Sequence, residues 1–273
     1  MHRLITAQLR RLVRQRAFYV CLVLAAALGI GISMLYHYFW TQRGANIAMS
    51  YRMMEFYGMD TTVLDEALSV VPKLDIWSFI NAFFSDEVKW ILSSICVCSL
   101  ITAEYSSGTV KNSIARGFSR GAIYFSRFIV ALAQVFGVSA AYIGAGAITA
   151  LFFVENPPET PPEEIIICLA TYILLLIATA SLFLALAVIF RRSGISVAVA
   201  IAAPMLILSV MSILTMTDPD AVRYSRFVLM ETFVTVAQYI SSGEAWAAPV
   251  IALIYLAVSY ITGFLVFRRS DIR

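Results

Sequence analysis

Amide and charged side chains interrupt the long apolar stretches of this chain at only a few positions. Polar groups at membrane depth usually face the interior of a helix bundle or a water-filled cavity, and a proline removes one helical hydrogen bond. Asp86 and Glu87 allow a second interpretation, because with Lys89 they can form a simple charge cluster at the membrane interface. The candidates for a transport path are Asn81, Asp86, Glu87, Gln134 and Pro204.

Side chains that bind metals or catalyse reactions are scarce. His2 and His37 are the only histidines, whereas a metalloprotease site needs clustered histidine and acidic ligands. Glu163-Glu164 lacks the histidine partners of an intramembrane peptidase. The pair Cys96-Val-Cys98 does not have the spacing of a zinc or redox motif, so the four cysteines are interpreted as small buried hydrophobes. We therefore expect no metal site, no disulfide framework and no catalytic residue.

The segment 104–120 reads Glu-Tyr-Ser-Ser-Gly-Thr-Val-Lys-Asn-Ser-Ile-Ala-Arg-Gly-Phe-Ser-Arg. Ser107 or Thr109 can cap the start of a helix, and Gly117 or Gly121 can end it, which predicts a helix of about three turns. Lys111, Asn112 and Arg116 fall on its other faces, while spacing of three to four residues places one apolar edge together: Val110, Ile114 and Phe118.

Two interpretations of this short helix stay open on physical grounds. Its apolar edge suits insertion into a groove on another protein, and the same amphipathic pattern suits a helix that touches only lipid headgroups.

The elements that position these residues are membrane-spanning helices. The chain has 273 residues, of which 60% are hydrophobic and 14% are charged, against about half and about a quarter in a soluble domain. A bilayer core requires about 17–25 mainly apolar residues in a helix. The sequence predicts an all-α integral membrane protein with a single transmembrane domain over 1–273 and six spans: 17–39, 79–103, 128–154, 165–190, 194–216 and 246–267.

Charge divides between the two sides that these spans create. One side, which holds both termini and the loop 104–127, carries 14 of the 20 basic residues and only two of the 17 acidic residues. Lysine and arginine favour the cytoplasmic side. We therefore expect both termini and the 104–127 loop to be cytoplasmic.

Four further segments are predicted outside the spans. Leu4, Ile5, Leu9, Leu12 and Val13 recur near helical spacing among arginines, which predicts an amphipathic helix along the inner leaflet; plain topogenic charge is the alternative. Residues 40–77 suit a small helical cap. The proline-containing segment 155–164 suits a stiff loop, and the amphipathic stretch 227–240 suits a helix that lies on the outer surface or re-enters the membrane.

The order of residues in the 104–120 segment resembles the inner loop of ABC-2 type permeases, the membrane subunits of ATP-binding-cassette exporters. The match rests on Glu104, Gly108, Thr109, Ser119 and Arg120. The closing stretch Phe-Arg-Arg-Ser-Asp-Ile at 267–272 also resembles the end of such permeases. The length of 40–77 departs from the family pattern and leaves the first outer region uncertain.

The resemblance implies that the 104–120 loop sits in a cleft of an ATPase subunit. The loop would transmit the closure of that subunit to the spans. Glu104 would orient that contact, and the basic residues would pair with acidic groups or phospholipid. The residues implied in coupling are Glu104, Gly108, Thr109, Val110, Lys111, Ile114, Arg116, Phe118 and Arg120.

The sequence contains no G-x-x-x-x-G-K-[ST] run, which is the loop that cradles phosphates. The resemblance therefore implies that ATP and Mg²⁺ bind two copies of a partner ATPase. It further implies a second permease subunit, the same or similar, in a prokaryotic cytoplasmic membrane. We expect export of a hydrophobic or amphipathic peptide, lipid or drug, and no nucleic-acid partner. A non-transporting membrane anchor or sensor is the alternative, and an intramembrane enzyme is a weaker one.

Overall fold

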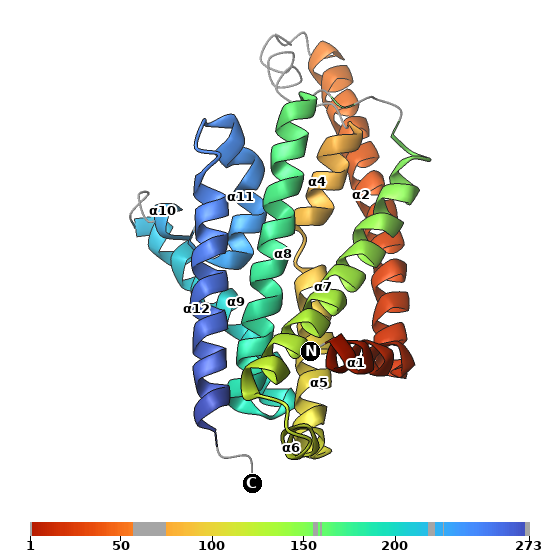
Figure 1. The fold of residues 1–273 in the computed structure, drawn as a ribbon. Coiled ribbons are helices and arrows are strands. Elements are labelled where there is room, and N and C mark those ends of the chain that lie inside the picture. The colour runs from red at the N-terminus through yellow and green to blue at the C-terminus, as the bar shows by residue number, and fades with distance from the viewer. Residues whose placement is uncertain are drawn as a thin grey trace.

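The structure is a computed structural model that describes residues 2–56, 75–154, 158, 160–217, 222–225 and 227–270. Helices make up nearly all of this described part, which contains no β-strand. Most of them run roughly along one axis and form a single bundle, as Figure 1 shows. The prediction of an all-α fold is confirmed.

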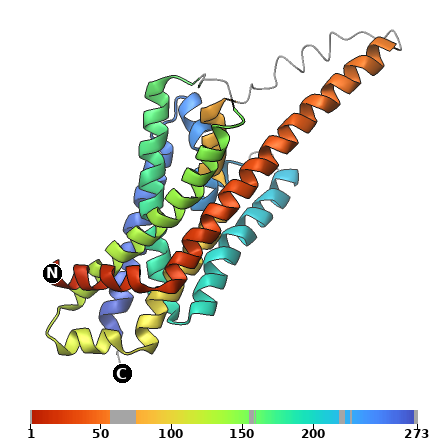
Figure 2. The ribbon, with the colours of Figure 1, turned by 90° about the vertical axis from the view of Figure 1, so that its right-hand side faces the viewer.

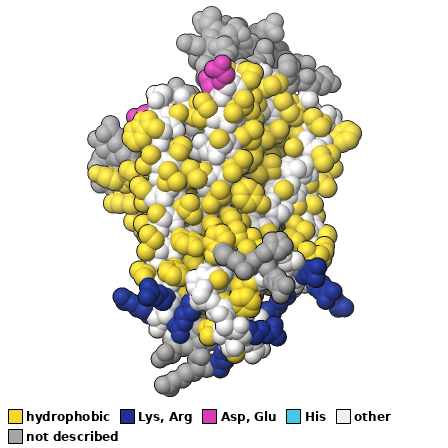
Figure 3. All heavy atoms as spheres, in the orientation of Figure 1, with side chains coloured by type: hydrophobic (Ala, Val, Ile, Leu, Met, Phe, Trp, Pro, Cys, Tyr) yellow, Lys and Arg dark blue, Asp and Glu magenta, His cyan; other side chains and the backbone are white. Residues whose placement is uncertain are grey.

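Within the described residues, six helices are long and apolar enough to cross a membrane, and the predicted number of spans is confirmed. They define an all-α, multi-pass membrane protein. On the face shown in Figure 3, hydrophobic side chains form a broad belt, with arginine and lysine at one end and acidic side chains at the other. The six helices are α2 (Arg16–Phe56), α5 (Val88–Ser106), α7 (Arg120–Ala150), α8 (Pro162–Phe190), α9 (Ser193–Thr217) and α12 (Ala247–Arg269).

The second predicted span, 79–103, is wrong as one continuous helix. The structure divides it into α4 (Ile76–Ser85) and α5, with Asp86 in extended conformation between them. The Asp86 side chain accepts a hydrogen bond from the backbone N–H of Val88, so it satisfies a free donor at the start of the new helix. Asp75 caps α4 in the same way, by accepting from the N–H of Ser78.

Two other boundaries differ from the sequence prediction. α7 begins at Arg120 rather than at 128, because Ser119 caps it by accepting from the N–H of Ala122. α2 continues without interruption to Phe56, so residues 40–56 continue the first helix beyond its span and are not a separate cap. The rest of the proposed cap, 57–74, lies outside the described residues.

The N-terminal amphipathic helix is present as α1 (His2–Arg14), and it lies across the ends of the longer helices in Figure 2. Leu4 and Leu12 are buried, and Leu12 packs with Leu100 and Val130. Val13, predicted on the same apolar side, is 56% exposed. This difference arises because only a narrow edge of α1 meets the bundle.

The main core surrounds α8, which packs against α12, α7, α5 and α9. A second apolar cluster joins α2 to α7 and α4, where the two long helices approach closely. A Cβ atom on Gly29 would lie 2.4 Å from the carbonyl oxygen of Tyr142. Glycine at this position is therefore what permits the contact between α2 and α7.

The predicted helix at 227–240 is α11 (Leu229–Ser241), which follows the short α10 (Val222–Ser225). α11 packs into the bundle, because Phe233 and Val236 are buried in the main core against α8 and α12. Residues 155–157 and 159 of the predicted stiff loop lie outside the described residues. α8 then starts with Pro162 in its first turn.

Candidate functional site

The 104–120 segment forms a short helix, α6 (Thr109–Ala115), at the end of the bundle that also carries the C-terminal end of α12 (Figure 1). We call this the α6 end. The helix has seven residues, fewer than the three turns predicted. Gly108 (φ +65°) precedes it and Gly117 (φ +82°) follows it, and residues other than glycine rarely adopt this left-handed conformation. The two glycines therefore set its length.

The predicted side-chain cap on α6 is wrong. Gly108 occupies the N-cap position and supplies no side chain. The hydroxyl groups of Ser107 and Thr109 instead bond to each other at 2.8 Å.

The apolar edge of α6 faces the protein's own bundle. Val110 is 2% exposed, and Ile114 and Phe118 are partly buried against the main core. Lys111 and Arg116 are exposed. The surface that α6 offers to another molecule is therefore polar and basic, and its apolar edge anchors it to the spans.

Glu104 lies at the base of this loop and is buried in an ion pair. Its Oε2 atom lies 2.8 Å from Nε of Arg127 on α7, and both side chains are at most 5% exposed. Its Oε1 atom lies 3.7 Å from a guanidinium nitrogen of Arg11 on α1. Buried charges are stable only when paired, so Glu104 holds three helices together and is not itself a surface for a partner.

Two arginines extend these connections. Arg127 lies over the rings of Tyr105 and Phe267, with 4.8 and 5.3 Å to the ring centroids, which adds α12 to the cluster. Arg11 donates a hydrogen bond of 3.1 Å to Thr109. α1 therefore contacts both the end of α5 and the first residue of α6.

Arg120, the last residue of the segment, contacts the C-terminal end of α12. Its guanidinium donates to the carbonyl oxygens of Arg268 and Ser270. The last carbonyl groups of a helix lack helical partners and carry partial negative charge. Arg120 therefore fixes the end of α12 beside the start of α7.

Three of the five transport-path candidates gather at the break between α4 and α5. The hydroxyl of Tyr142 on α7 donates to the Asp86 carboxylate, and the hydroxyl of Tyr172 on α8 donates to the Asn81 side chain. Glu87 lies beside Asp86 and is exposed. Polar groups from four helices, counting α4 and α5 separately, therefore converge where the second span is interrupted.

Lys89 belongs to the same cluster of polar groups and is 4% exposed. Its Nζ donates a 2.7 Å hydrogen bond to the carbonyl oxygen of Asp86 and lies 4.5 Å from the ring centroid of Phe233. Burial, together with the negative charge of Glu87, raises the pKa of Glu231 on α11. The cluster therefore combines a buried cation, aromatic faces and carboxyl groups.

The other two candidates lie elsewhere. Gln134 donates to the carbonyl oxygen of Cys96, at 3.2 Å, in the interior between α5 and α7. Pro204 lies within α9 and lines a mainly apolar cavity of about 180 Å³ with Trp90 and Tyr255. The five positions therefore do not form one continuous path.

Several residues of these clusters were missed by sequence reasoning. By sequence alone, Arg127 is only a basic loop residue, and Arg11 is only one of the arginines of the amphipathic N-terminal helix. Tyr142 and Tyr172 lie in apolar runs and gave no polar signal. Their hydrogen bonds to Asp86 and Asn81, which are distant in the chain, cannot be read from one sequence.

The fold and these buried polar clusters define a multi-pass helical membrane protein. Residues 21–273 match the model of the family described as "Protein of unknown function (DUF2705)". The chain belongs to this family. No curated protein matches it.

Proposed function

We propose that this chain is the membrane-spanning permease subunit of an ATP-driven ABC exporter in a prokaryotic cytoplasmic membrane. The observation that carries the proposal is the placement of α6. This helix connects α5 to α7 at the basic end of the molecule. The Glu104–Arg127 ion pair joins the same two helices next to it. The positive-inside rule puts this end, and both termini, in the cytoplasm.

The geometry suggests how movement would pass through α6. Its buried edge fixes it to α5 and α7, so a force on its exposed side displaces both helices. Lys111 and Arg116 offer that exposed side to acidic groups of an ATPase. The basic residues at the same end can also bind phospholipid headgroups.

ATP and Mg²⁺ bind the partner in this proposal, because the chain has no phosphate-cradling loop. Two ATPase subunits dock beneath two permease subunits, the second being the same or a similar chain. Closure of the ATPases on ATP then shifts the spans between inward-facing and outward-facing states.

The cargo in this proposal is hydrophobic or amphipathic, such as a peptide, a lipid or a drug. The cavity beside Pro204 is lined almost entirely by apolar side chains and lies between spans. The cluster around Asp86 and Lys89 supplies polar contacts.

The test is ATPase stimulation in nanodiscs that contain the chain and the ATPase that co-purifies with it from native membranes. We expect the double variant Lys111→Glu with Arg116→Glu to assemble its spans normally and to lose stimulation. Arg269→Glu is the matched control, because Arg269 is also exposed and basic at the α6 end but is not part of α6. This control should keep stimulation.

Three results would contradict the proposal. Full stimulation by the α6 double variant would remove the coupling role of this helix. Purification without any ATPase would favour a membrane anchor or sensor. If a cysteine introduced at Asn112 could be labelled from outside the cell, the α6 end would not be cytoplasmic and the proposal would fail.

A further inference from the structure

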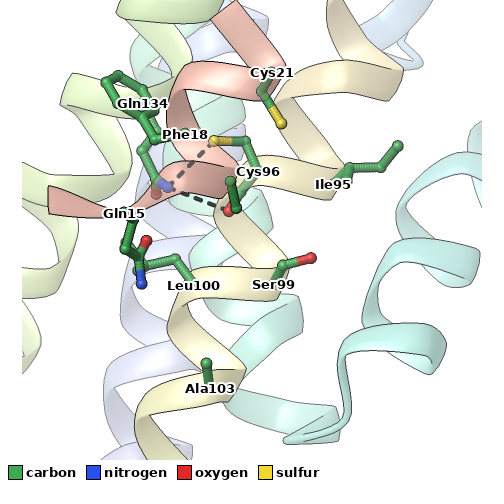
Figure 4. Close-up of a pocket in the computed structure, with 10 residues that line it drawn as sticks. Gln15, Phe18, Cys21, Ile95, Cys96, Ser99, Leu100, Ala103 and Gln134 are labelled. Atoms are coloured by element: carbon green, nitrogen blue, oxygen red, sulfur yellow. Dashed lines mark hydrogen bonds between the residues drawn. The ribbon is translucent and has the colours of Figure 1, made fainter. Parts of the chain in front are cut away.

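A cavity of about 180 Å³ lies between α2, α5 and α7, in the half of the bundle nearer the α6 end. Figure 4 shows the residues around it. Its walls are mostly apolar, but they include the thiols of Cys21 and Cys96 and the amide of Gln134. Gln15, at the break between α1 and α2, and Ala103, near the end of α5, also line it. The cavity therefore reaches toward the α6 end.

Cys21 and Cys96 come from different helices and are far apart in sequence. Both side chains line this cavity in Figure 4, and the two thiols lie within hydrogen-bonding reach of each other. The side chains are buried, with residues 8% and 6% exposed. Cys98, two residues after Cys96 on α5, instead donates to the carbonyl oxygen of Phe183 on α8. The structure thus forms a thiol pair that the Cys96-Val-Cys98 spacing does not reveal.

Gln134 supplies a second and independent observation. Its Nε2 donates to the sulfur of Cys96 at 3.3 Å, and a hydrogen bond donated to sulfur favours the thiolate. Its Oε1 is buried and has no hydrogen-bond partner, although Gln134 is only 1% exposed. Leaving a buried polar atom unsatisfied is costly, and such an atom often marks an ion or ligand site.

We propose that Cys21 and Cys96 bind one Cu(I) ion. Thiolates are soft ligands that select Cu(I), and two sulfurs suffice for a two-coordinate soft ion. Within the described residues, no group of three or more His, Cys, Asp or Glu side chains is placed to hold a metal, which disfavours a tetrahedral zinc site. The two thiols each release a proton, two Cu–S bonds form, and no electron is transferred.

The surroundings suit this chemistry. A Cu(I) ion with two thiolates carries one negative charge, and the Gln134 N–H stabilises that charge at the Cys96 sulfur. The cavity that the thiols line is also bordered by Gln15 and Ala103, which lie nearer the α6 end. Bound copper would cross-link α2 to α5, the first two spans.

The experiment uses the full chain, purified in detergent under anaerobic and reducing conditions and titrated with Cu(I) in competition with a chromogenic Cu(I) chelator. We expect one Cu(I) per chain, and loss of this binding in Cys21→Ser and in Cys96→Ser. The matched controls are Cys98→Ser and Cys168→Ser, which remove buried thiols outside the pair. Both should keep one Cu(I) per chain.

Two further measurements keep the result decisive if a serine variant is unstable. Copper-edge X-ray absorption of the unmodified protein should show two sulfur neighbours, and copper should protect Cys21 and Cys96, but not Cys98, from alkylation after mild denaturation. Unchanged copper binding in the Cys21→Ser variant would overturn the proposal. So would dependence on Cys98 or Cys168, or a copper site without sulfur ligands.

Discussion

The indole N–H of Trp90 donates a hydrogen bond of 2.9 Å to the carbonyl oxygen of Ala200. Ala200 lies four residues before Pro204, which has no N–H to offer in the regular helical pattern. Trp90 on α5 therefore supplies the donor that the proline removes from α9. The backbone hydrogen bond that Pro204 removes from α9 is thus replaced by one from Trp90.

The first prediction follows from this contact. Trp90→Phe leaves the Ala200 carbonyl without a donor, and an unsatisfied buried group costs about 1–3 kcal/mol. Part of the loss in Trp90→Phe also comes from the edge contact between Trp90 and Phe183. We therefore expect a smaller loss in a Pro204→Ala background, where residue 204 can donate to Ala200. Thermal unfolding of the four proteins in detergent measures this coupling. Equal losses in both backgrounds would show that Trp90 acts only through packing.

The second prediction concerns the Glu104–Arg127 ion pair. Glu104→Ala leaves a cation buried without its partner, which costs about 3–5 kcal/mol, so the midpoint of thermal unfolding should fall sharply. The double change Glu104→Leu with Arg127→Met should recover much of the stability, because an apolar pair of similar size avoids the cost of burying charge. Glu163→Ala, at an exposed acid in the first turn of α8, is the control and should change little. No recovery in the double variant would indicate that the Tyr105 and Phe267 contacts of Arg127 dominate.

The third prediction tests the approach of α2 to α7. Gly29→Val places side-chain atoms against the Tyr142 backbone, and overpacking of this kind costs about 1–3 kcal/mol. Gly31→Val is the matched control, because a Cβ atom at Gly31 meets nothing within 4 Å. Both changes have the same effect on helix propensity, so the difference in unfolding temperature reports the contact. Equal unfolding temperatures would show that α2 and α7 separate easily.

The fourth prediction is a pH dependence. Burial and the charge of Glu87 raise the pKa of Glu231 above its ordinary value of 4.5. The folded protein then holds this proton more tightly than the unfolded chain, so stability declines as pH rises from 4.5 through the raised pKa. Glu231→Gln should flatten this part of the curve of unfolding temperature against pH, and Glu87→Gln should reduce its slope.

The control for this pH series is Glu244→Gln, at an exposed position after α11. It should leave the slope unchanged. A slope that persists in Glu231→Gln would assign the dependence to another group.

Long-range pairings were the part of the site that sequence could not provide. The six spans were predictable because uninterrupted apolar runs have few alternatives in a bilayer. The break at Asp86 had a visible signal in three charges within four residues. By contrast, Arg127 and Arg120 look alike in sequence, yet one is buried beside Glu104 and the other caps α12. Which cation turns inward depends on the packing of helices that are distant in sequence.

The length of α2 had a local signal that was overlooked. Residues 40–56 contain no proline and a single glycine, Gly44, so nothing in their composition ends the preceding helix. The polarity of the segment suggested a separate cap, but a helix can leave the apolar layer and continue in water. Polarity therefore marks the boundary of the span and not the end of the helix.

This continuation makes α2 project beyond its membrane span. A helix of 41 residues is about 60 Å long, roughly twice the thickness of the hydrocarbon layer. Even when tilted, α2 carries the chain about 25 Å beyond Phe39, on the side opposite α6. An epitope or a fluorescent probe near Phe56 would lie outside the detergent belt. It could report the tilt of α2 while ligands or nucleotides act at the α6 end.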